Sequence, residues 1–131
     1  MTFSKLLQRE KEGRPIKVSI VGAGMMGIGV ANQIFRMRGI KVAMITDIVI
    51  EKALKGYAAN GIPREKVHIS NRLFEIQDAL RDGKFVVSED GGMAAQVDVD
   101  VVVEATGRPE VGAEIAYRSI LGRKHVVMLL C

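Results

Sequence analysis

Val18-Ser19-Ile20-Val21-Gly22-Ala23-Gly24-Met25-Met26-Gly27 is the stretch of sequence that decides the fold. Its apolar first part is typical of a strand and runs directly into the pattern G-x-G-x-x-G. The glycines alone are weak evidence, but a helix-compatible segment follows them, and Asp47 lies 20 residues beyond Gly27. A strand, a glycine loop, a helix and an acid at this distance predict a dinucleotide-binding βαβ unit.

Each glycine of this loop has a physical role in that prediction. Gly22 permits the tight turn out of the strand, Gly24 lets the backbone approach a pyrophosphate, and Gly27 lets the helix pack closely on the strand. The first N–H groups of the helix lack intrahelical partners, so they point at the anion. The loop contains no Gly-Lys-Ser/Thr, which excludes a P-loop. The predicted pyrophosphate-binding residues are Gly22, Ala23, Gly24, Met25, Met26 and Gly27; the alternative is a glycine-rich turn that binds nothing.

Composition and charge narrow the class of protein. The 131 residues fit one domain, and they are 48% hydrophobic and 5% aromatic, with no Trp. Such a composition suits a parallel sheet that is buried on both faces by helices. The net charge of +4 comes from scattered basic residues, which favours a solvated surface over a nucleic-acid partner.

The single cysteine and the absence of long apolar runs indicate a compartment. Cys131 excludes an intramolecular disulfide and fits a reducing environment, and we expect it to be a buried thiol at the end of a strand. The first seventeen residues are charged throughout and lack the apolar core of a secretory signal. No apolar stretch is long enough to span a bilayer. We therefore expect a cytoplasmic protein without a membrane partner.

Hydrophobic periodicity and turn residues predict alternating strands and helices. Helices are expected over residues 2–12, 25–37, 49–59, 71–81 and 109–121, and strands over 17–21, 41–46, 84–88, 100–104 and 125–130. Residues 62–69 are predicted to form a loop with limited structure, and 91–96 a short turn or helix. The alternation predicts a single α/β domain with a Rossmann-type, doubly wound parallel sheet. Residues 1–16 would be an N-terminal helical extension of a nucleotide-binding domain over 17–131.

Asp47 bears on the choice of cofactor. At the end of the second strand, its carboxylate can accept hydrogen bonds from both adenosine-ribose hydroxyls and would repel a 2′-phosphate. Ile48 follows it where an Arg would favour that phosphate. These residues favour NAD, with NADP still possible; alternatively, Asp47 is a helix N-cap or turn residue, alone or in addition.

A second cluster, Ala105-Thr106-Gly107, follows the predicted strand at 100–104. Its position at the end of a central strand places it beside the crevice in which open α/β sheets bind ligands. A βα turn without a function is an equal alternative. Glu104 is an acid in an apolar strand, and it is either a hydrogen-bonded structural carboxylate or a group that faces cofactor or substrate. Arg108 lies either at the surface or toward an anionic ligand.

Residues 17–130 resemble the N-terminal NAD(P)-binding domain of homoserine-dehydrogenase-like oxidoreductases. More narrowly, they resemble the branch that carries a C-terminal SAF domain and is similar to deoxyxylulose-phosphate reductoisomerase-like enzymes. The resemblance is carried by the glycine loop at 21–27, by Asp47 and by three further segments, Val86–Asp90, Asp100–Gly112 and Gly122–Met128.

The resemblance implies a cofactor domain whose catalytic and dimerisation region comes later in the chain. No catalytic residue can be assigned within 131 residues. The chain alone would bind dinucleotide and be inactive, whereas the full-length protein would hold a small-molecule substrate and form a homo-oligomer. The alternative function is a regulatory NAD(H)-sensing module. His68 and His125 have no acid or Cys at ligand spacing, so no metal site is expected.

Overall fold

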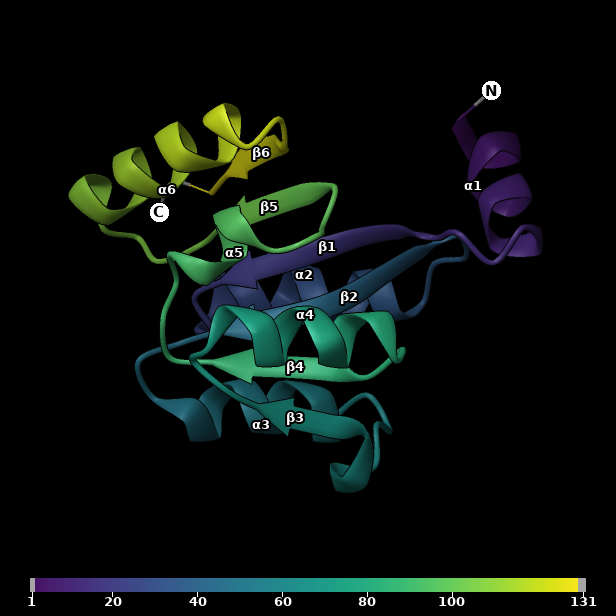
Figure 1. Cartoon of the computed structure of the whole chain (residues 1–131), viewed down its shortest axis with the longest axis horizontal. Coiled ribbons are helices and arrows are strands. Elements are labelled where there is room, and N and C mark those ends of the chain that lie inside the picture. Colours follow the sequence, from purple (N-terminus) through teal and green to yellow (C-terminus); the bar gives the residue numbers. More distant parts are fainter. Residues whose placement is uncertain (1, 130–131) are drawn as a thin grey trace.

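The computed structural model describes residues 2–129 and has one sheet of six parallel strands in the order β3-β4-β2-β1-β5-β6 (Figure 1). The strands are β1 (Ile16–Val21), β2 (Ile40–Thr46), β3 (Val67–Ile69), β4 (Phe85–Ser88), β5 (Val101–Glu104) and β6 (His125–Met128). The helices are α1 (Thr2–Lys11), α2 (Met25–Phe35), α3 (Ile50–Ala58), α4 (Leu73–Arg81), α5 (Met93–Gln96) and α6 (Pro109–Leu121), with a 3₁₀ turn at Arg64–Lys66. The predicted Rossmann-type α/β fold is confirmed.

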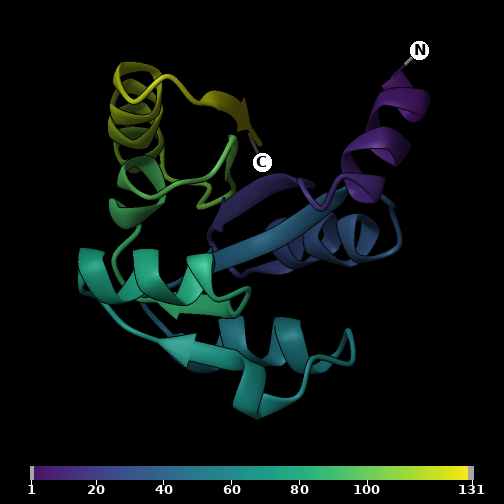
Figure 2. The ribbon, with the colours of Figure 1, turned by 45° about the vertical axis from the view of Figure 1, so that its right-hand side comes forward.

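Helices cover both faces of the sheet (Figures 1 and 2). A layer of hydrophobic side chains joins them to the sheet on each face. On one face α2 and α3 pack on the sheet through Ala31, Ile34 and Tyr57, all buried. On the other face α4, α5 and α6 pack through buried side chains that include Ile76 and Ile115. The sheet is therefore covered on both sides, as right-handed crossovers between parallel strands require.

One predicted element was wrong. Residues 62–69, expected to be a loop, contain the strand β3 at one edge of the sheet. It pairs in parallel with β4, with His68 opposite Val86. The strand has only three residues, and its hydrogen bonds are made to a segment far along the chain. Backbone pairing therefore outweighs the weak local pattern around Pro63.

The central strands end level with one another, which places the loops that follow them side by side. In the register of the sheet, Val21 at the end of β1 lies opposite Thr46 of β2 on one side and Glu104 of β5 on the other. Gly22, Asp47 and Ala105 each follow directly. Segments that are far apart in sequence are thus brought together at the carboxyl ends of the central strands.

The helix α1 lies beyond the amino ends of β1 and β2 (Figure 2). Its Arg9 forms an ion pair of 3.9 Å with Asp100, which also accepts a hydrogen bond from the Lys17 N–H (2.8 Å). None of the helices within residues 2–129 is long and apolar enough to cross a membrane. Cys131, expected to be buried at a strand end, lies outside the described residues.

Candidate functional site

A cavity of about 360 Å³ lies at the carboxyl ends of β1, β2 and β5. Five predicted site residues line it: Gly22, Gly24, Asp47, Ala105 and Thr106. Ligands of open α/β sheets bind at the carboxyl ends of the strands, at the point where the chain connections reverse direction. Here they reverse at β1, since β2 lies on one side of it and β5 on the other.

The loop out of β1 has the conformation that its glycines predict. Gly22 has φ +102, which favours glycine, and a Cβ there would lie 2.7 Å from the carbonyl oxygen of Ala105. A Cβ on Gly27 would collide with the carbonyl oxygen of Gly22. A Cβ on Gly24 would have no neighbour within 4 Å, because Gly24 faces open space at the cavity.

The helix α2 begins at this cavity with unpaired backbone donors. Gly24 is its N-cap, and the first intrahelical bond runs from the Ile28 N–H to the Gly24 carbonyl (3.0 Å). The N–H groups before Ile28 in the first turn of α2 have no intrahelical acceptor, and the helix dipole is positive at this end. The site therefore offers donors and positive potential to an anion without using a basic side chain.

The side chains of Met25 and Met26 lie outside the core. Met25 is 92% exposed and Met26 44% exposed. Both lie in the first turn of α2. Further along α2, Ala31 and Ile34 pack on the sheet.

Asp47 holds two backbone segments together at the side of the cavity. Its Oδ2 accepts a hydrogen bond from the Ala23 N–H (2.7 Å), and its Oδ1 accepts one from the Val49 N–H (2.8 Å). Asp47 is therefore a turn residue, whereas the N-cap of α3 is Val49. Each carboxylate oxygen has a further lone pair and the side chain is only half-buried, so it can still accept from a ligand hydroxyl.

The lining residues that the sequence did not predict include Lys52, Glu89 and Gly91. Lys52 of α3 contributes a cation on the Asp47 side, and Glu89 and Gly91 come from the loop after β4. Lys52 is in the first turn of α3, the helix that follows Asp47 along the chain. The β4 loop could be placed only once β4 was known to lie beside β2.

The turn after β5 forms the wall opposite Asp47. Gly107 has φ +70, and the Arg108 N–H donates to Thr106 Oγ1 (3.2 Å). Arg108 lines the cavity and lies 3.6 Å from Glu110 in an ion pair at the surface. Glu104 is 2% exposed, and its Oε1 accepts hydrogen bonds from both the N–H and the hydroxyl of Thr106.

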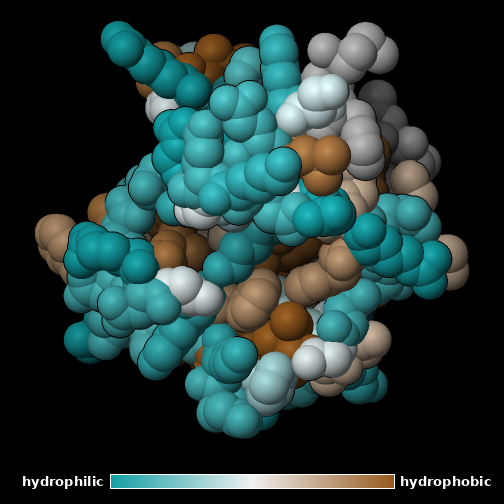
Figure 3. Space-filling model, turned by 90° about the vertical axis from the view of Figure 1, so that its right-hand side faces the viewer, coloured by the Kyte–Doolittle hydropathy of each residue, from teal (hydrophilic) through white to brown (hydrophobic). Residues whose placement is uncertain are grey.

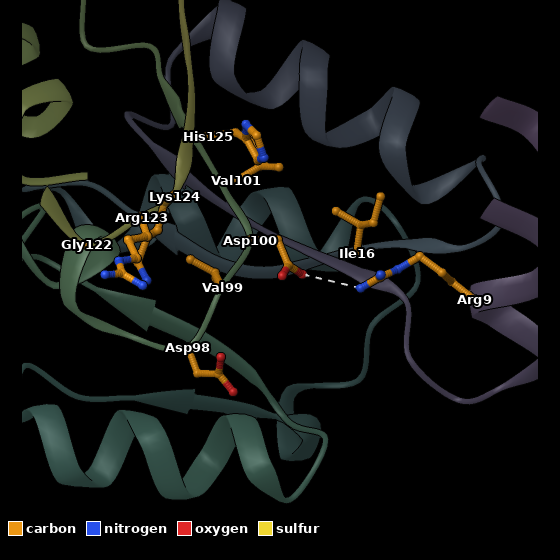
Figure 4. Close-up of a pocket in the computed structure, with 10 residues that line it drawn as sticks. All are labelled: Arg9, Ile16, Asp98, Val99, Asp100, Val101, Gly122, Arg123, Lys124 and His125. Carbon is orange, nitrogen blue, oxygen red and sulfur yellow. Dashed lines mark ion pairs between the residues drawn. The ribbon is translucent and has the colours of Figure 1, made fainter. Parts of the chain in front are cut away.

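A larger cavity, of about 450 Å³, lies at the other end of the strands, near the amino ends of β1, β5 and β6 (Figure 4). Arg9, Asp98, Asp100, Arg123 and His125 are among its lining residues. This end of the molecule is largely hydrophilic, with a few hydrophobic side chains among the polar ones (Figure 3). Asp100 and Arg9 are already paired across it. Among residues 2–129 no group of His, Cys, Asp and Glu is arranged to hold a metal ion.

The sequence profile of the family described as "3-hydroxyacyl-CoA dehydrogenase, NAD binding domain" matches residues 17–110. The chain belongs to this family. The matched segment contains the glycine loop, Asp47 and the turn after β5, the three parts that meet at the smaller cavity. A nicotinamide dinucleotide is therefore the cofactor class of this domain, and the domain is of the dehydrogenase type.

The same fold is found in solved structures of longer enzymes. Scyllo-inositol dehydrogenase from Lactobacillus casei, with bound NAD(H) and scyllo-inositol, superposes with a TM-score of 0.64 at 20% identity over 88% of this chain. Myo-inositol dehydrogenase from the same organism, with NAD(H) and myo-inositol, gives 0.64 at 17% identity over 87%. A diketoreductase gives 0.51 at 17% identity over 88% of this chain and 42% of its own.

The chain spans 28% of the length of each inositol dehydrogenase. At these identities the likeness shows the fold. No curated protein matches the chain significantly.

Proposed function

We propose that this chain is the cofactor-binding domain of a homoserine-dehydrogenase-like NAD(P)-dependent oxidoreductase of the SAF-containing branch. The observation that carries the proposal is that the glycine loop, the start of α2, Asp47 and the turn after β5 all meet at one cavity. The finer family rests on the motifs at 21–27 and 100–112. The matches to dehydrogenases do not favour the alternative, a regulatory NAD(H)-sensing module.

Each part of the cavity has one task in this proposal. The N–H groups at the start of α2 bind the pyrophosphate, with Gly24 leaving room for its close approach. Asp47 accepts from the adenosine ribose, and Ala105, Thr106 and Gly107 border the other half of the dinucleotide. When bound, the nicotinamide supplies hydride transfer. The substrate is held by a region outside these 131 residues, so the domain alone is inactive. The full-length protein forms a homo-oligomer and lies in the cytoplasm.

The cofactor preference tests the role given to Asp47. We expect NAD⁺ to bind more tightly than NADP⁺ in calorimetric titrations of the purified domain, because the Asp47 carboxylate repels a 2′-phosphate. Lys52 is the cation nearest in sequence to that position on the cavity wall. Lys52→Gln should therefore weaken NADP⁺ binding more than it weakens NAD⁺ binding. A clear preference for NADP⁺ in the unchanged chain would contradict the assignment of Asp47.

A further inference from the structure

Glu104 is a fully buried acid, at 2% exposure, and it has no ion-pair partner among the residues that the structure describes. A buried carboxylate is costly unless hydrogen bonds replace the water that it has lost. In Glu104 both visible hydrogen bonds converge on Oε1, and both come from Thr106. The hydrogen bonds that offset the cost of burying this acid therefore come from one residue of the turn that borders the cavity.

These hydrogen bonds fix the whole turn after β5. The Thr106 hydroxyl donates to Glu104, which orients its lone pairs to accept the Arg108 N–H (3.2 Å) at the N-cap of α6. Between them Gly107 takes its positive φ of 70°. The path from Glu104 through Thr106 to Arg108 thus defines where the strand ends and where the next helix begins.

The turn is packed directly against the glycine loop. The Ala105 N–H donates to the Val21 carbonyl (2.7 Å), and the Ala105 carbonyl fills the space that a Gly22 side chain would need. A displacement of the turn therefore changes the width of the cavity between the two walls. Asp47 anchors the glycine loop from the other side through the Ala23 N–H, so each wall is held by its own carboxylate.

Gly112 leaves the space that Glu104 occupies. A Cβ on Gly112 would lie 2.5 Å from Glu104 Oε2 and 3.2 Å from Met128 Cε. Gly112 is in α6, where alanine is intrinsically favoured over glycine by about 1 kcal/mol. The carboxylate thus sits where only a glycine in the helix permits it.

We propose that Glu104 is a positioning residue for cofactor binding: it holds the Ala105-Thr106-Gly107 turn in the shape that receives the half of the dinucleotide farther from Asp47. This inference rests on the proposed function. In it Glu104 acts on cofactor binding through the turn, without touching the ligand. The adenosine half is received by the walls at Gly24 and Asp47, which Glu104 does not touch.

The test compares NAD⁺ with ADP, which lacks the nicotinamide riboside, in calorimetric titrations of the 131-residue chain and its variants. Gly112→Ala pushes Glu104 out of place without changing a polar group, and we expect it to weaken NAD⁺ binding about tenfold, the loss of one charged hydrogen-bonding arrangement. Its affinity for ADP should be unchanged. Gly29→Ala in α2, where a Cβ meets nothing within 4 Å, is the matched control and should change neither affinity.

Two substitutions at Glu104 itself complete the test. Glu104→Ala should reproduce the selective loss of NAD⁺ affinity, and Glu104→Gln should restore it, since the amide oxygen can accept the same two hydrogen bonds. Equal losses for NAD⁺ and ADP, or an unchanged NAD⁺ affinity in Gly112→Ala and Glu104→Ala, would overturn the positioning role while the proposed function stands. Failure of the unchanged chain to bind either nucleotide would overturn both.

Discussion

Two glycines of the same loop have opposite surroundings. A Cβ on Gly27 would meet the carbonyl oxygen of Gly22, whereas a Cβ on Gly24 would meet nothing within 4 Å. Gly27→Ala should therefore lower the free energy of unfolding by roughly 1–3 kcal/mol, because the backbone carbonyl cannot move aside easily. Gly24→Ala should lower it by only about 0.5 kcal/mol, the difference between glycine and alanine at an N-cap. Urea denaturation of both variants measures the difference, and equal stabilities would contradict the close packing of α2 on β1.

Ser19, in the middle of β1, carries a polar group that the fold does not use. Its side chain is fully buried, and its hydroxyl has no hydrogen-bond partner within the described part of the chain. We expect Ser19→Ala to raise the free energy of unfolding by about 1 kcal/mol, because the hydroxyl loses water on folding and gains nothing in return.

The control for that substitution is Ser119, which is equally buried but donates to the Ile115 carbonyl (2.7 Å). Ser119→Ala should give no comparable gain, because it removes a hydrogen bond that is made. Urea denaturation distinguishes the two sites. A stability loss in Ser19→Ala would mean that its hydroxyl is bonded after all.

A residue with positive φ follows several of the helices, and it is a glycine after α1, α2, α3 and α4. Gly39, Gly61 and Gly83 each adopt a positive φ after a helix, but after α6 the corresponding residue is Arg123, with φ 61°. A side chain in this conformation costs about 1 kcal/mol relative to glycine. Arg123→Gly should accordingly raise the thermal midpoint of unfolding.

Gly83→Ala is the converse substitution, because Gly83 has φ +78 and open space around its Cβ position. Its cost would be conformational alone, so the thermal midpoint should fall by an amount similar to the gain in Arg123→Gly. Opposite signs in a thermal melt support this reading of the turns. A loss of stability in Arg123→Gly would show that the arginine side chain makes a contact that outweighs its strained backbone.

Elements with strong local patterns were predictable, and those that depend on distant partners were not. Hydrophobic periodicity predicted helices over residues 25–37 and 71–81, and the structure has α2 and α4 there, with Ile34 and Ile76 in the core. The strand β3 was missed because its hydrogen bonds lie with β4. At the site, the glycine loop and Asp47 were recognisable by spacing, but the bond from Ala23 to Asp47 follows from the sheet register, which no local pattern encodes.

At the scale of the whole molecule, Tyr57 joins α3 to the sheet. It is fully buried, its hydroxyl donates to the Val86 carbonyl (3.0 Å), and its ring packs edge-on against Phe35 and Phe85. Burial raises the pKa of the Tyr57 hydroxyl well above its ordinary value of 10.0. The folded state therefore keeps a proton that the unfolded state releases above about pH 10.

This linkage predicts how stability changes in alkali. The contribution of Tyr57 is complete below pH 10 and is lost as the pH rises above that value, by up to about 1.4 kcal/mol per pH unit. Tyr57→Phe should be about 1 kcal/mol less stable near neutral pH, through loss of the hydrogen bond, and should show a shallower alkaline decline. Urea denaturation at about pH 8 and pH 11 compares the slopes; parallel slopes would contradict the burial of a neutral hydroxyl.

The central claim is that a dinucleotide binds against the glycine loop at the start of α2, and one substitution tests it most directly. Gly24 faces the cavity with open space in front of it, so Gly24→Val leaves the core intact and fills the position given to the pyrophosphate. Calorimetric titration with NAD⁺ should show binding by the unchanged chain and none by Gly24→Val, whose circular dichroism stays the same and whose thermal midpoint falls only slightly. Full NAD⁺ affinity in the folded variant would contradict the account and move the binding site elsewhere.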